Sequence, residues 1–358
     1  MPRLVSDPGE IDADWLTEAL RESGALPTGR VTSVSSNLIG TGKMADNVRY
    51  ELTYSGAPGD APASVVAKLP AAEPTARANS IARKSYLREV RFYQEIARHI
   101  PMRTPHTHVA LIDDAASDYV ILMEDLAPAR PGDQTDACTL EQAELAVREA
   151  AKLHAPLMND DSLLESEAIN QSGPEGSDLG QRLMLQLSPA FVERFRDRIS
   201  AEGEALVERF SHGFAAWAQG YDGPRTAVHA DYRSENMLFG AAEGGHPISV
   251  VDWQSPLYAC PLVDIAYFLG NGPSTQDRRV HERELVETYR KEMGAFGVDL
   301  SPDDCWRQYR RNSLHGILIT VLGCMTSGQE ERSDRMFGNM IERHLQHALD
   351  LEADEFLN

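Results

Sequence analysis

The first third of the chain alternates short apolar runs with polar turns and predicts a small, mainly β unit. Residues 11–22 place apolar side chains at helical spacing and predict an N-terminal helix. Short segments rich in Val, Ile, Leu and Tyr then predict five strands, at residues 31–39, 47–54, 63–69, 109–112 and 119–123. Between the third and fourth strands, apolar positions near helical spacing predict one helix over residues 80–99.

The rest of the chain has mostly helical periodicity. The Pro- and Gly-containing segment 127–132 cannot continue a strand or a helix, so we place a boundary between residues 125 and 126. A helix over residues 140–154 is predicted, with Thr139 as its cap. Further helices are predicted through most of 156–220, with a loop at 172–176, and at 277–293, 305–325 and 330–351. The fold class is α+β, with an N-terminal unit of residues 1–125 and a larger unit of residues 126–358.

Composition and charge narrow the possible partners. The 358 residues are 42% hydrophobic and 25% charged, as in a soluble globular protein. The net charge of −21 gives no positive field to attract phosphate backbones, so we expect no nucleic-acid partner. The same charge would suit a cationic substrate, although acidity is also a common means of keeping a protein soluble.

The cysteines and the apolar stretches indicate a cytoplasmic protein that is not anchored in a membrane. The four cysteines, at positions 138, 260, 305 and 324, include no C-x-x-C pair, which predicts free thiols rather than a zinc site or a disulfide framework. The N-terminus lacks an apolar signal core, and the longest apolar stretch, residues 317–325, falls short of the roughly 20 residues that a bilayer needs. His106 and His108 have no further ligand at metal-binding spacing.

The chemistry is concentrated in residues 229–236, which read H-x-D-x-x-x-x-N, and in the Val-Val-Asp-Trp segment at 250–253. Phosphoryl transfer from a nucleotide needs one carboxylate to accept or orient the proton of the attacking hydroxyl, which we assign to Asp231. It also needs oxygen ligands that hold Mg²⁺ against the phosphates, and Asn236 and Asp252 are the candidates. One tight loop can aim Asp231 and Asn236 at the same point, and the strand that ends at Asp252 supplies the third group.

This arrangement resembles the aminoglycoside phosphotransferase and choline kinase superfamily, whose loop usually reads H-G-D-x-x-x-x-N. The pattern is most similar to the ecdysteroid-kinase-like branch in its Asp252-Trp253-Gln254, its apolar segment 264–269 and its Leu153-His154-Ala155. Ala230 stands where the family usually has glycine. The resemblance implies a protein-kinase-like fold of two lobes: a small five-stranded antiparallel β lobe with one helix, and a larger, mainly helical lobe. It also implies ATP and Mg²⁺ as cofactors.

Two features predict a nucleotide site in the N-terminal unit. Gly40 and Gly42 lie between two predicted strands, where glycines let backbone amides approach phosphates, although a lone G-x-G is a weak signal and no Walker A loop is present. Lys68 ends the strand segment Val-Val-Ala-Lys, close to the V-A-I-K pattern, and is expected to neutralise the α- and β-phosphates.

The lysine needs an anionic partner from the following helix. Glu89 and Glu95 are both candidates, and the resemblance favours Glu89, which precedes an apolar stretch that contains aromatic residues. The resemblance also implies that main-chain atoms of Glu124 and Leu126, in the linker after the fifth strand, contact the nucleotide base.

Three further residues accompany the catalytic loop. We expect His229 to pack behind Asp231 rather than to act as a base, and Asp264 to cap its helix and tie it to the loop. Arg233 could offset the local negative charge or contact substrate, and the sequence leaves both roles open.

The length of the segment after Asp252 limits the acceptor to a small molecule. Only residues 253–263 separate Asp252 from Asp264, and the A-P-E motif of protein kinases is missing, so there is no platform for a peptide. The sequence therefore predicts an ATP-dependent kinase that phosphorylates a hydroxyl of a small, mainly apolar molecule. Apolar residues in the helices at about 156–220 and 277–351 could line its pocket or pack between helices. The alternatives are an aminoglycoside kinase, a hydroxyacyl-thioester kinase, or a nucleotide-binding regulator without catalysis.

Overall fold

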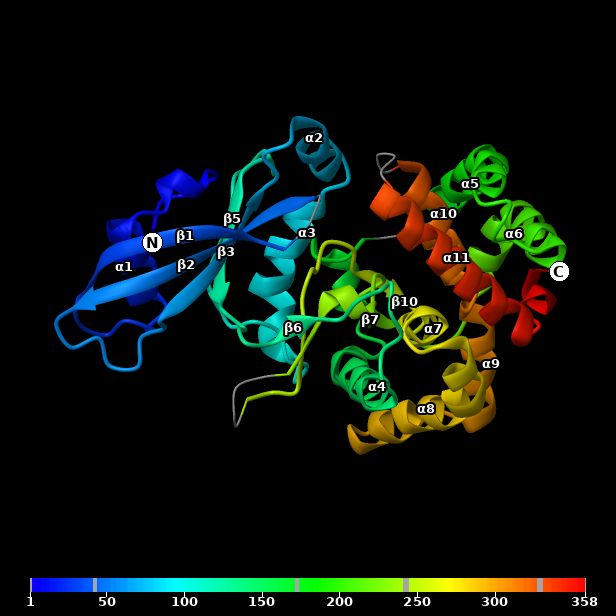
Figure 1. The fold of residues 1–358 in the computed structure, drawn as a ribbon. Helices are drawn as coiled ribbons and strands as arrows, with labels where there is room; N and C mark the ends of the chain where they lie inside the picture. The colour runs from blue at the N-terminus through cyan, green and yellow to red at the C-terminus, as the bar shows by residue number, and fades with distance from the viewer. Residues whose placement is uncertain (1, 41–43, 171–173, 241–244, 327–330, 358) are drawn as a thin grey trace.

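A computed structural model describes residues 2–40, 44–170, 174–240, 245–326 and 331–357. The molecule has a β-rich part formed by the N-terminal third and a larger helical part formed by the rest of the chain (Figure 1). Short strands in the chain segment around residues 226–259 lie between them. The fold is α+β and protein-kinase-like, as predicted.

The β-rich part is built on one antiparallel sheet. Its strands are β1 (Arg30–Ile39), β2 (Ala45–Ser55), β3 (Ser64–Pro70), β4 (Thr107–Ile112) and β5 (Tyr119–Glu124), in the order β1-β2-β3-β5-β4. All five predicted strands are confirmed, and the helical insertion falls between β3 and β4 as expected. The order places β3, which carries Lys68, in the centre of the sheet, so both faces of this strand can be covered.

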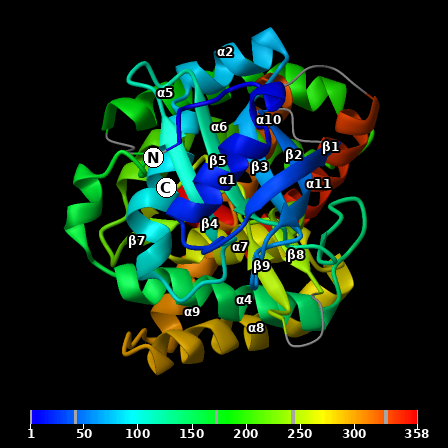
Figure 2. The ribbon, with the colours of Figure 1, turned by 90° about the vertical axis from the view of Figure 1, so that its left-hand side faces the viewer.

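Helix α1 (Ala13–Glu22) covers one face of this sheet (Figure 2). It begins two residues later than predicted, because the side chain of Asp12 caps it by accepting the Trp15 amide at 2.8 Å. Trp15, Leu16 and Leu20 pack with sheet residues in one apolar cluster. This face of the sheet is therefore closed, and the opposite face remains for the site.

The prediction of a single helix over residues 80–99 is wrong. The structure has α2 (Pro74–Ala82) and α3 (Ser85–Arg91), followed by a π-helical turn (Phe92–Ile96) and a short 3-10 turn (Ala97–His99). The break is at Lys84, whose φ of 55° lies in the left-handed region that stops a helix. No glycine or proline marks this break in the sequence, so periodicity alone runs through it.

Eight helices account for most of the described residues after 131: α4 (Leu140–His154), α5 (Pro174–Arg194), α6 (Ala201–Gln219), α7 (Leu262–Asn271), α8 (Thr275–Ala295), α9 (Pro302–Asn312), α10 (His315–Thr326) and α11 (Glu331–Asp350). Thr139 caps α4 through a capping box, as predicted. The single helix expected over 305–325 is wrong, because residues 313 and 314 separate α9 from α10. The prediction of a loop at residues 172–176 is wrong for residues 174–176, because α5 begins at Pro174. Residues 172 and 173 lie outside the described part of the chain.

Two small antiparallel sheets flank the loop that contains the H-x-D-x-x-x-x-N motif. Strand β7 (Thr226–Val228) pairs with β10 (Leu257–Ala259), and β8 (Met237–Phe239) pairs with β6 (Arg130–Pro131) and β9 (Ile248–Val250). The loop between β7 and β8 contains the H-x-D-x-x-x-x-N motif and ends in a 3-10 turn (Ser234–Asn236). Both ends of this loop are therefore fixed by pairing to other strands.

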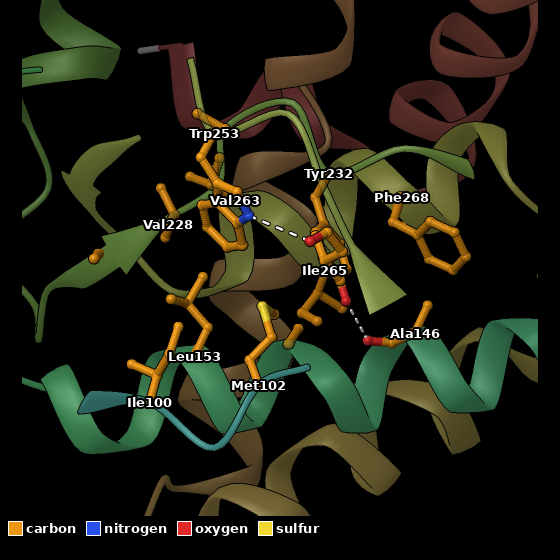
Figure 3. Packing of buried hydrophobic residues seen from close by; sticks show 14 of the residues in the cluster. Ile100, Met102, Ala146, Leu153, Val228, Tyr232, Trp253, Val263, Ile265 and Phe268 are labelled. Carbon is orange, nitrogen blue, oxygen red and sulfur yellow. Dashed lines mark hydrogen bonds between the residues drawn. The ribbon is translucent and has the colours of Figure 1, made fainter. Parts of the chain in front are cut away.

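One apolar core runs continuously between the two parts of the molecule. The cluster includes Val66 and Phe92 from the β-rich part as well as Val228, Trp253 and many residues of α4 and α7. The ring of Trp253 stacks on Phe92 with a centroid distance of 3.8 Å and an interplanar angle of 5°. Figure 3 shows the part of the cluster above α4, where the Tyr232 hydroxyl donates to the Ala146 carbonyl at 2.7 Å. The two parts therefore share a core, and the boundary at residues 125/126 stays a prediction.

The other expectations concern the cysteines and the membrane. All four cysteines are free thiols, and Cys260, Cys305 and Cys324 are buried. None of the helices in the described part of the chain is both long and apolar enough to cross a bilayer.

Helix packing in the larger part depends on a glycine. A Cβ atom added at Gly316 of α10 would lie 2.1 Å from Nδ1 of His344, a fully buried side chain of α11. We predict that Gly316→Ala lowers the free energy of unfolding by about 1–3 kcal/mol, because the buried ring cannot move aside without disturbing its neighbours. Gly294→Ala is the control, since nothing lies within 4 Å of its added Cβ and alanine favours a helix by up to about 1 kcal/mol. Denaturant unfolding tests the pair, and equal stabilities of the two variants would contradict this packing.

Candidate active site

The backbone of the catalytic loop is held by Asp264 of α7. Its carboxylate accepts the amides of His229 at 2.7 Å and Ala230 at 2.9 Å, and it also contacts Nε2 of His154 at 3.1 Å. Burial would raise the pKa of Asp264, but its contacts with His154 and His229 outweigh burial and lower it. The predicted tie to the loop is confirmed. The predicted cap is wrong, because Pro261 occupies the N-cap position and no side chain caps α7.

Ala230 has a φ of 64°, in the left-handed region that costs an L-residue about 1–2 kcal/mol. This conformation explains why the resembling family uses glycine here. In this chain the two hydrogen bonds that Asp264 accepts offset the strain, and they leave the following residue, Asp231, facing solvent-accessible space with 28% of its side chain exposed.

Three side chains surround the carboxylate of Asp231. The Tyr267 hydroxyl donates to Oδ1 at 3.3 Å, and the Asn236 amide nitrogen donates to Oδ2 at 3.0 Å. The guanidinium of Arg233 lies beside it, with Nε 3.2 Å from Oδ2. These contacts fix the orientation of the carboxylate without covering it.

His229 lies behind the catalytic loop. Its ring is fully buried, its Nε2 lies 3.0 Å from the Val251 carbonyl, and it packs on Trp253 at 4.5 Å between centroids. The Asp231 amide donates to its Nδ1 at 3.3 Å. The imidazole therefore connects the loop to Val251, the residue between β9 and Asp252, and it does not face the open side of the site.

Asn236 and Asp252 lie at the two ends of the β8–β9 hairpin, one just before β8 and the other two residues after β9. The register pairs Met237 with Val250, and the Val251 amide donates to the Asn236 carbonyl at 3.0 Å. With its NH₂ group on Asp231, Asn236 has its side-chain oxygen left for a cation, and Asp252 adds a carboxylate. Hard oxygen donors of this kind fit Mg²⁺. Among the described residues no group of three or more acidic, His or Cys side chains could hold a metal by itself, so further ligands must come from elsewhere.

Lys68 joins the β-rich part to Asp252. Its side chain is 7% exposed, and its Nζ lies 2.7 Å from Glu89 of α3 and 2.6 Å from Oδ1 of Asp252. Burial would lower the pKa of Lys68, but the two carboxylates outweigh burial and raise it. Burial would likewise raise the pKa of Asp252, but Lys68 lowers it, so both groups are charged at neutral pH. Glu95, the alternative partner, accepts a hydrogen bond from Ser166 at 2.6 Å instead.

The remaining nucleotide candidates lie at the ends of strands. Gly40 follows β1 with a φ of 76°, a conformation that glycine adopts without strain, whereas Gly42 lies outside the described residues. The Glu124 amide donates to the His106 carbonyl at 2.8 Å, so the base can use only its carbonyl. The Leu126 carbonyl accepts the Ala129 amide at 2.9 Å.

Sequence reasoning missed two residues beside the catalytic loop. Tyr267 lies three residues after Asp264, on the same face of α7. This helical spacing could have predicted from the sequence that Tyr267 faces the loop that Asp264 holds. Gln134 is 2% exposed and accepts a hydrogen bond from Nη1 of Arg233 at 2.9 Å. It belongs to an irregular segment about a hundred residues away in the sequence, where no pattern marks it.

Several solved structures with a similar fold are small-molecule kinases. Spectinomycin phosphotransferase bound to ADP and spectinomycin superposes with a TM-score of 0.51 at 14% identity, covering 97% of this chain and 100% of that one. The GDP complex of aminoglycoside 2'-phosphotransferase-IIIa gives a TM-score of 0.53 at 12% identity, with 90% and 93% covered. Choline kinase from Cryptosporidium parvum Iowa II gives 0.54 at 9% identity, with 90% and 91% covered.

At these identities the similarity shows the fold alone. A search of curated protein sequences found no match. The sequence model of the ecdysteroid kinase-like family, however, matches residues 44–299, which include Lys68, the catalytic loop and Asp252. This chain therefore belongs to the ecdysteroid kinase-like family.

Proposed function

We propose that this protein is an ATP-dependent kinase that transfers the γ-phosphate to a hydroxyl of a small, mainly apolar acceptor. The observation that carries the proposal is the convergence of Lys68, Asp252, Asn236 and Asp231. Lys68 lies 2.6 Å from Asp252, which adjoins Asn236 across a hairpin, and Asn236 donates to Asp231 at 3.0 Å. These are the cation, the metal ligands and the catalytic carboxylate that phosphoryl transfer requires.

On the nucleotide side, the ammonium of Lys68 would move from Asp252 to the phosphates when ATP binds. Its ion pair with Glu89 would persist and keep the lysine side chain directed toward the site. Glu89 is 1% exposed, and its position is fixed because Phe92, one helical turn later, stacks on Trp253. Asn236 and Asp252 would hold Mg²⁺, which neutralises phosphate charge when it is bound. At the end of β1, Gly40 would leave room for the phosphates near its own backbone, because it carries no side chain.

On the acceptor side, Asp231 orients the attacking hydroxyl and takes its proton. Tyr267 and Asn236 each donate to one of its oxygens, so the carboxylate is already oriented before the acceptor binds. The Tyr267 ring is itself fixed, because it stacks on His344 with an interplanar angle of 8° and meets the edge of His315. The catalytic geometry is therefore supported by the packing of α7, α10 and α11.

One face of α10 supports an apolar acceptor. The helix starts at the catalytic loop, where Nε2 of His315 lies 3.2 Å from the Ala230 carbonyl. Leu318, Leu322 and Met325 follow His315 at helical spacing, and all three are only partly buried. An apolar stripe thus leads away from the loop that carries Asp231.

The acidic residues near the C-terminus do not form a cation pocket. Asp350 pairs with Arg279 at 2.8 Å, Asp354 with Arg209 at 2.9 Å and Glu355 with Arg310 at 2.9 Å. Because arginines of this chain already neutralise them, the net charge of −21 is weak support for a cationic acceptor. This favours an apolar alcohol over an aminoglycoside.

The first prediction from this proposal concerns the effect of Mg²⁺ on the affinity for ATP. Asn236 and Asp252 supply too few oxygens to hold Mg²⁺ alone, so we expect tight Mg²⁺ binding only together with ATP. Asp252→Ala should remove the effect of Mg²⁺ on ATP affinity in calorimetry. Asp354→Ala, which removes an exposed carboxylate paired with Arg209, is the control and should leave it intact. ATP affinity that is independent of Mg²⁺ in the unchanged protein would contradict the assignment.

The second prediction separates binding from chemistry. Asp231→Asn keeps the shape of the side chain but removes its negative charge and its ability to accept a proton. We expect nucleotide affinity to survive and turnover to fall by a factor on the order of 10² or more. Asp222→Asn changes an exposed carboxylate in the loop before β7 and should leave turnover unchanged. Near-normal turnover of Asp231→Asn would show that another group is the catalytic carboxylate.

The third prediction concerns the acceptor. ATP consumption should be stimulated by apolar alcohols or steroids in a panel that also contains aminoglycosides and hydroxyacyl thioesters. With the best acceptor, Leu322→Gln should raise the KM of the acceptor roughly tenfold, through lost apolar contact, and leave that of ATP unchanged. Leu179→Gln, at a leucine of α5 that is 50% exposed, is the matched control. Efficient phosphorylation of an aminoglycoside, with no activity on apolar alcohols, would overturn the apolar assignment.

A further inference from the structure

Near the catalytic loop, two buried N–H groups make no hydrogen bond within the described part of the chain. They are Nε of Arg233 and Nε2 of Gln134. A buried donor without a hydrogen bond costs roughly 1–3 kcal/mol, which makes such a group near a catalytic carboxylate a candidate for contact with a ligand. Both groups belong to side chains that contact each other, since Nη1 of Arg233 donates to Oε1 of Gln134 at 2.9 Å.

The pair is held by the backbone on both sides. The Gly132 amide donates to the carbonyls of Ser234 at 3.0 Å and Met237 at 3.1 Å, which ties the segment after β6 to the catalytic loop. A Cβ at Gly132 would lie 2.8 Å from the Ser234 carbonyl oxygen, so only glycine allows this approach. Gln134, two residues later, is thereby brought against Arg233 and is 2% exposed.

The guanidinium of Arg233 has one hydrogen bond, to Gln134, and two contacts with carboxylates. Its Nε lies 3.2 Å from Asp231, but without the alignment of a hydrogen bond, and Nη1 lies 3.3 Å from Glu235. Burial would lower the pKa of Arg233, but Asp231, Tyr267, Glu235 and Asp252 together raise it. The guanidinium therefore lies beside the carboxylate proposed to take the acceptor proton, with its Nε 3.2 Å from Oδ2 of Asp231.

We propose that Arg233, positioned by Gln134, binds the oxygens of the phosphoryl group during transfer. This inference rests on the proposed function. In that step the acceptor oxygen bonds to the γ-phosphorus, the bond from this phosphorus to the ADP oxygen breaks, and the acceptor proton passes to Asp231. The negative charge spread over the three phosphoryl oxygens then meets the guanidinium of Arg233, whose side chain is 23% exposed, while Gln134 holds that guanidinium in place from the buried side. A cation placed there stabilises the transition state, as arginines do in other phosphoryl-transfer enzymes.

A comparison of ATP with ADP tests this role without any acceptor. If Arg233 contacts the γ-phosphoryl oxygens, Arg233→Met should weaken Mg·ATP binding roughly tenfold and change Mg·ADP binding less than about twofold, as measured by calorimetry. Arg233→Lys keeps the charge but loses the planar fork, and should give an intermediate loss for ATP. Gln134→Leu should weaken ATP binding about threefold, again without affecting ADP.

The control is Arg148→Met, which removes an arginine that pairs with Glu144 and Glu292 on the surface. It should leave both affinities unchanged. Equal changes in ATP and ADP affinity in Arg233→Met and Gln134→Leu, or no change in either, would overturn the inference and indicate that Arg233 only balances Asp231. If Arg233→Met fails to fold, Arg233→Lys and Gln134→Leu report the same ATP-to-ADP ratio. Failure of the unchanged protein to bind either nucleotide would overturn the proposed function itself, and the inference with it.

Discussion

The buried ammonium of Lys68 between Glu89 and Asp252 is the interaction on which the site depends. A buried cation is tolerated only when carboxylates compensate its lost hydration, and here one carboxylate comes from each part of the molecule. The stack of Phe92 on Trp253 brings the two carboxylates to the same place, because each aromatic residue is close in sequence to one of them. The shared apolar core and the charged site therefore enforce the same arrangement of the two parts.

The catalytic loop depends on a second buried charge, Asp264. By accepting two consecutive amides it fixes the strained conformation of Ala230 and thereby the direction of Asp231. The same helix carries Tyr267, which holds the carboxylate of Asp231 from the other side. The ring of Tyr267 packs between His315 of α10 and His344 of α11, and His315 also contacts the loop at the Ala230 carbonyl. The helices that would surround the acceptor therefore also set the orientation of Asp231.

Features that depend on local sequence were predictable. The five strands follow from short segments rich in Val, Ile, Leu and Tyr, the cap of α4 follows from Thr139, and the family follows from the spacing of the catalytic loop and Asp252. Features that depend on tertiary contacts were not. The left-handed Lys84 and the break between α9 and α10 carry no glycine or proline, and Gln134 reaches Arg233 only because Gly132 docks on the catalytic loop.

The central claim is that Lys68, Asn236 and Asp252 form one site for a nucleotide and a metal ion. In the structure, Lys68 pairs with Asp252, and we expect the metal and the phosphates to replace that ion pair when they bind. The most direct test is a crystal structure with Mn²⁺ and a non-hydrolysable ATP analogue, with the metal located by its anomalous scattering. We predict one anomalous peak bridging Asp252 and the Asn236 side-chain oxygen, with Lys68 moved onto the phosphates and still paired with Glu89. A metal peak away from both residues, or a nucleotide bound with Lys68 still on Asp252, would contradict the account.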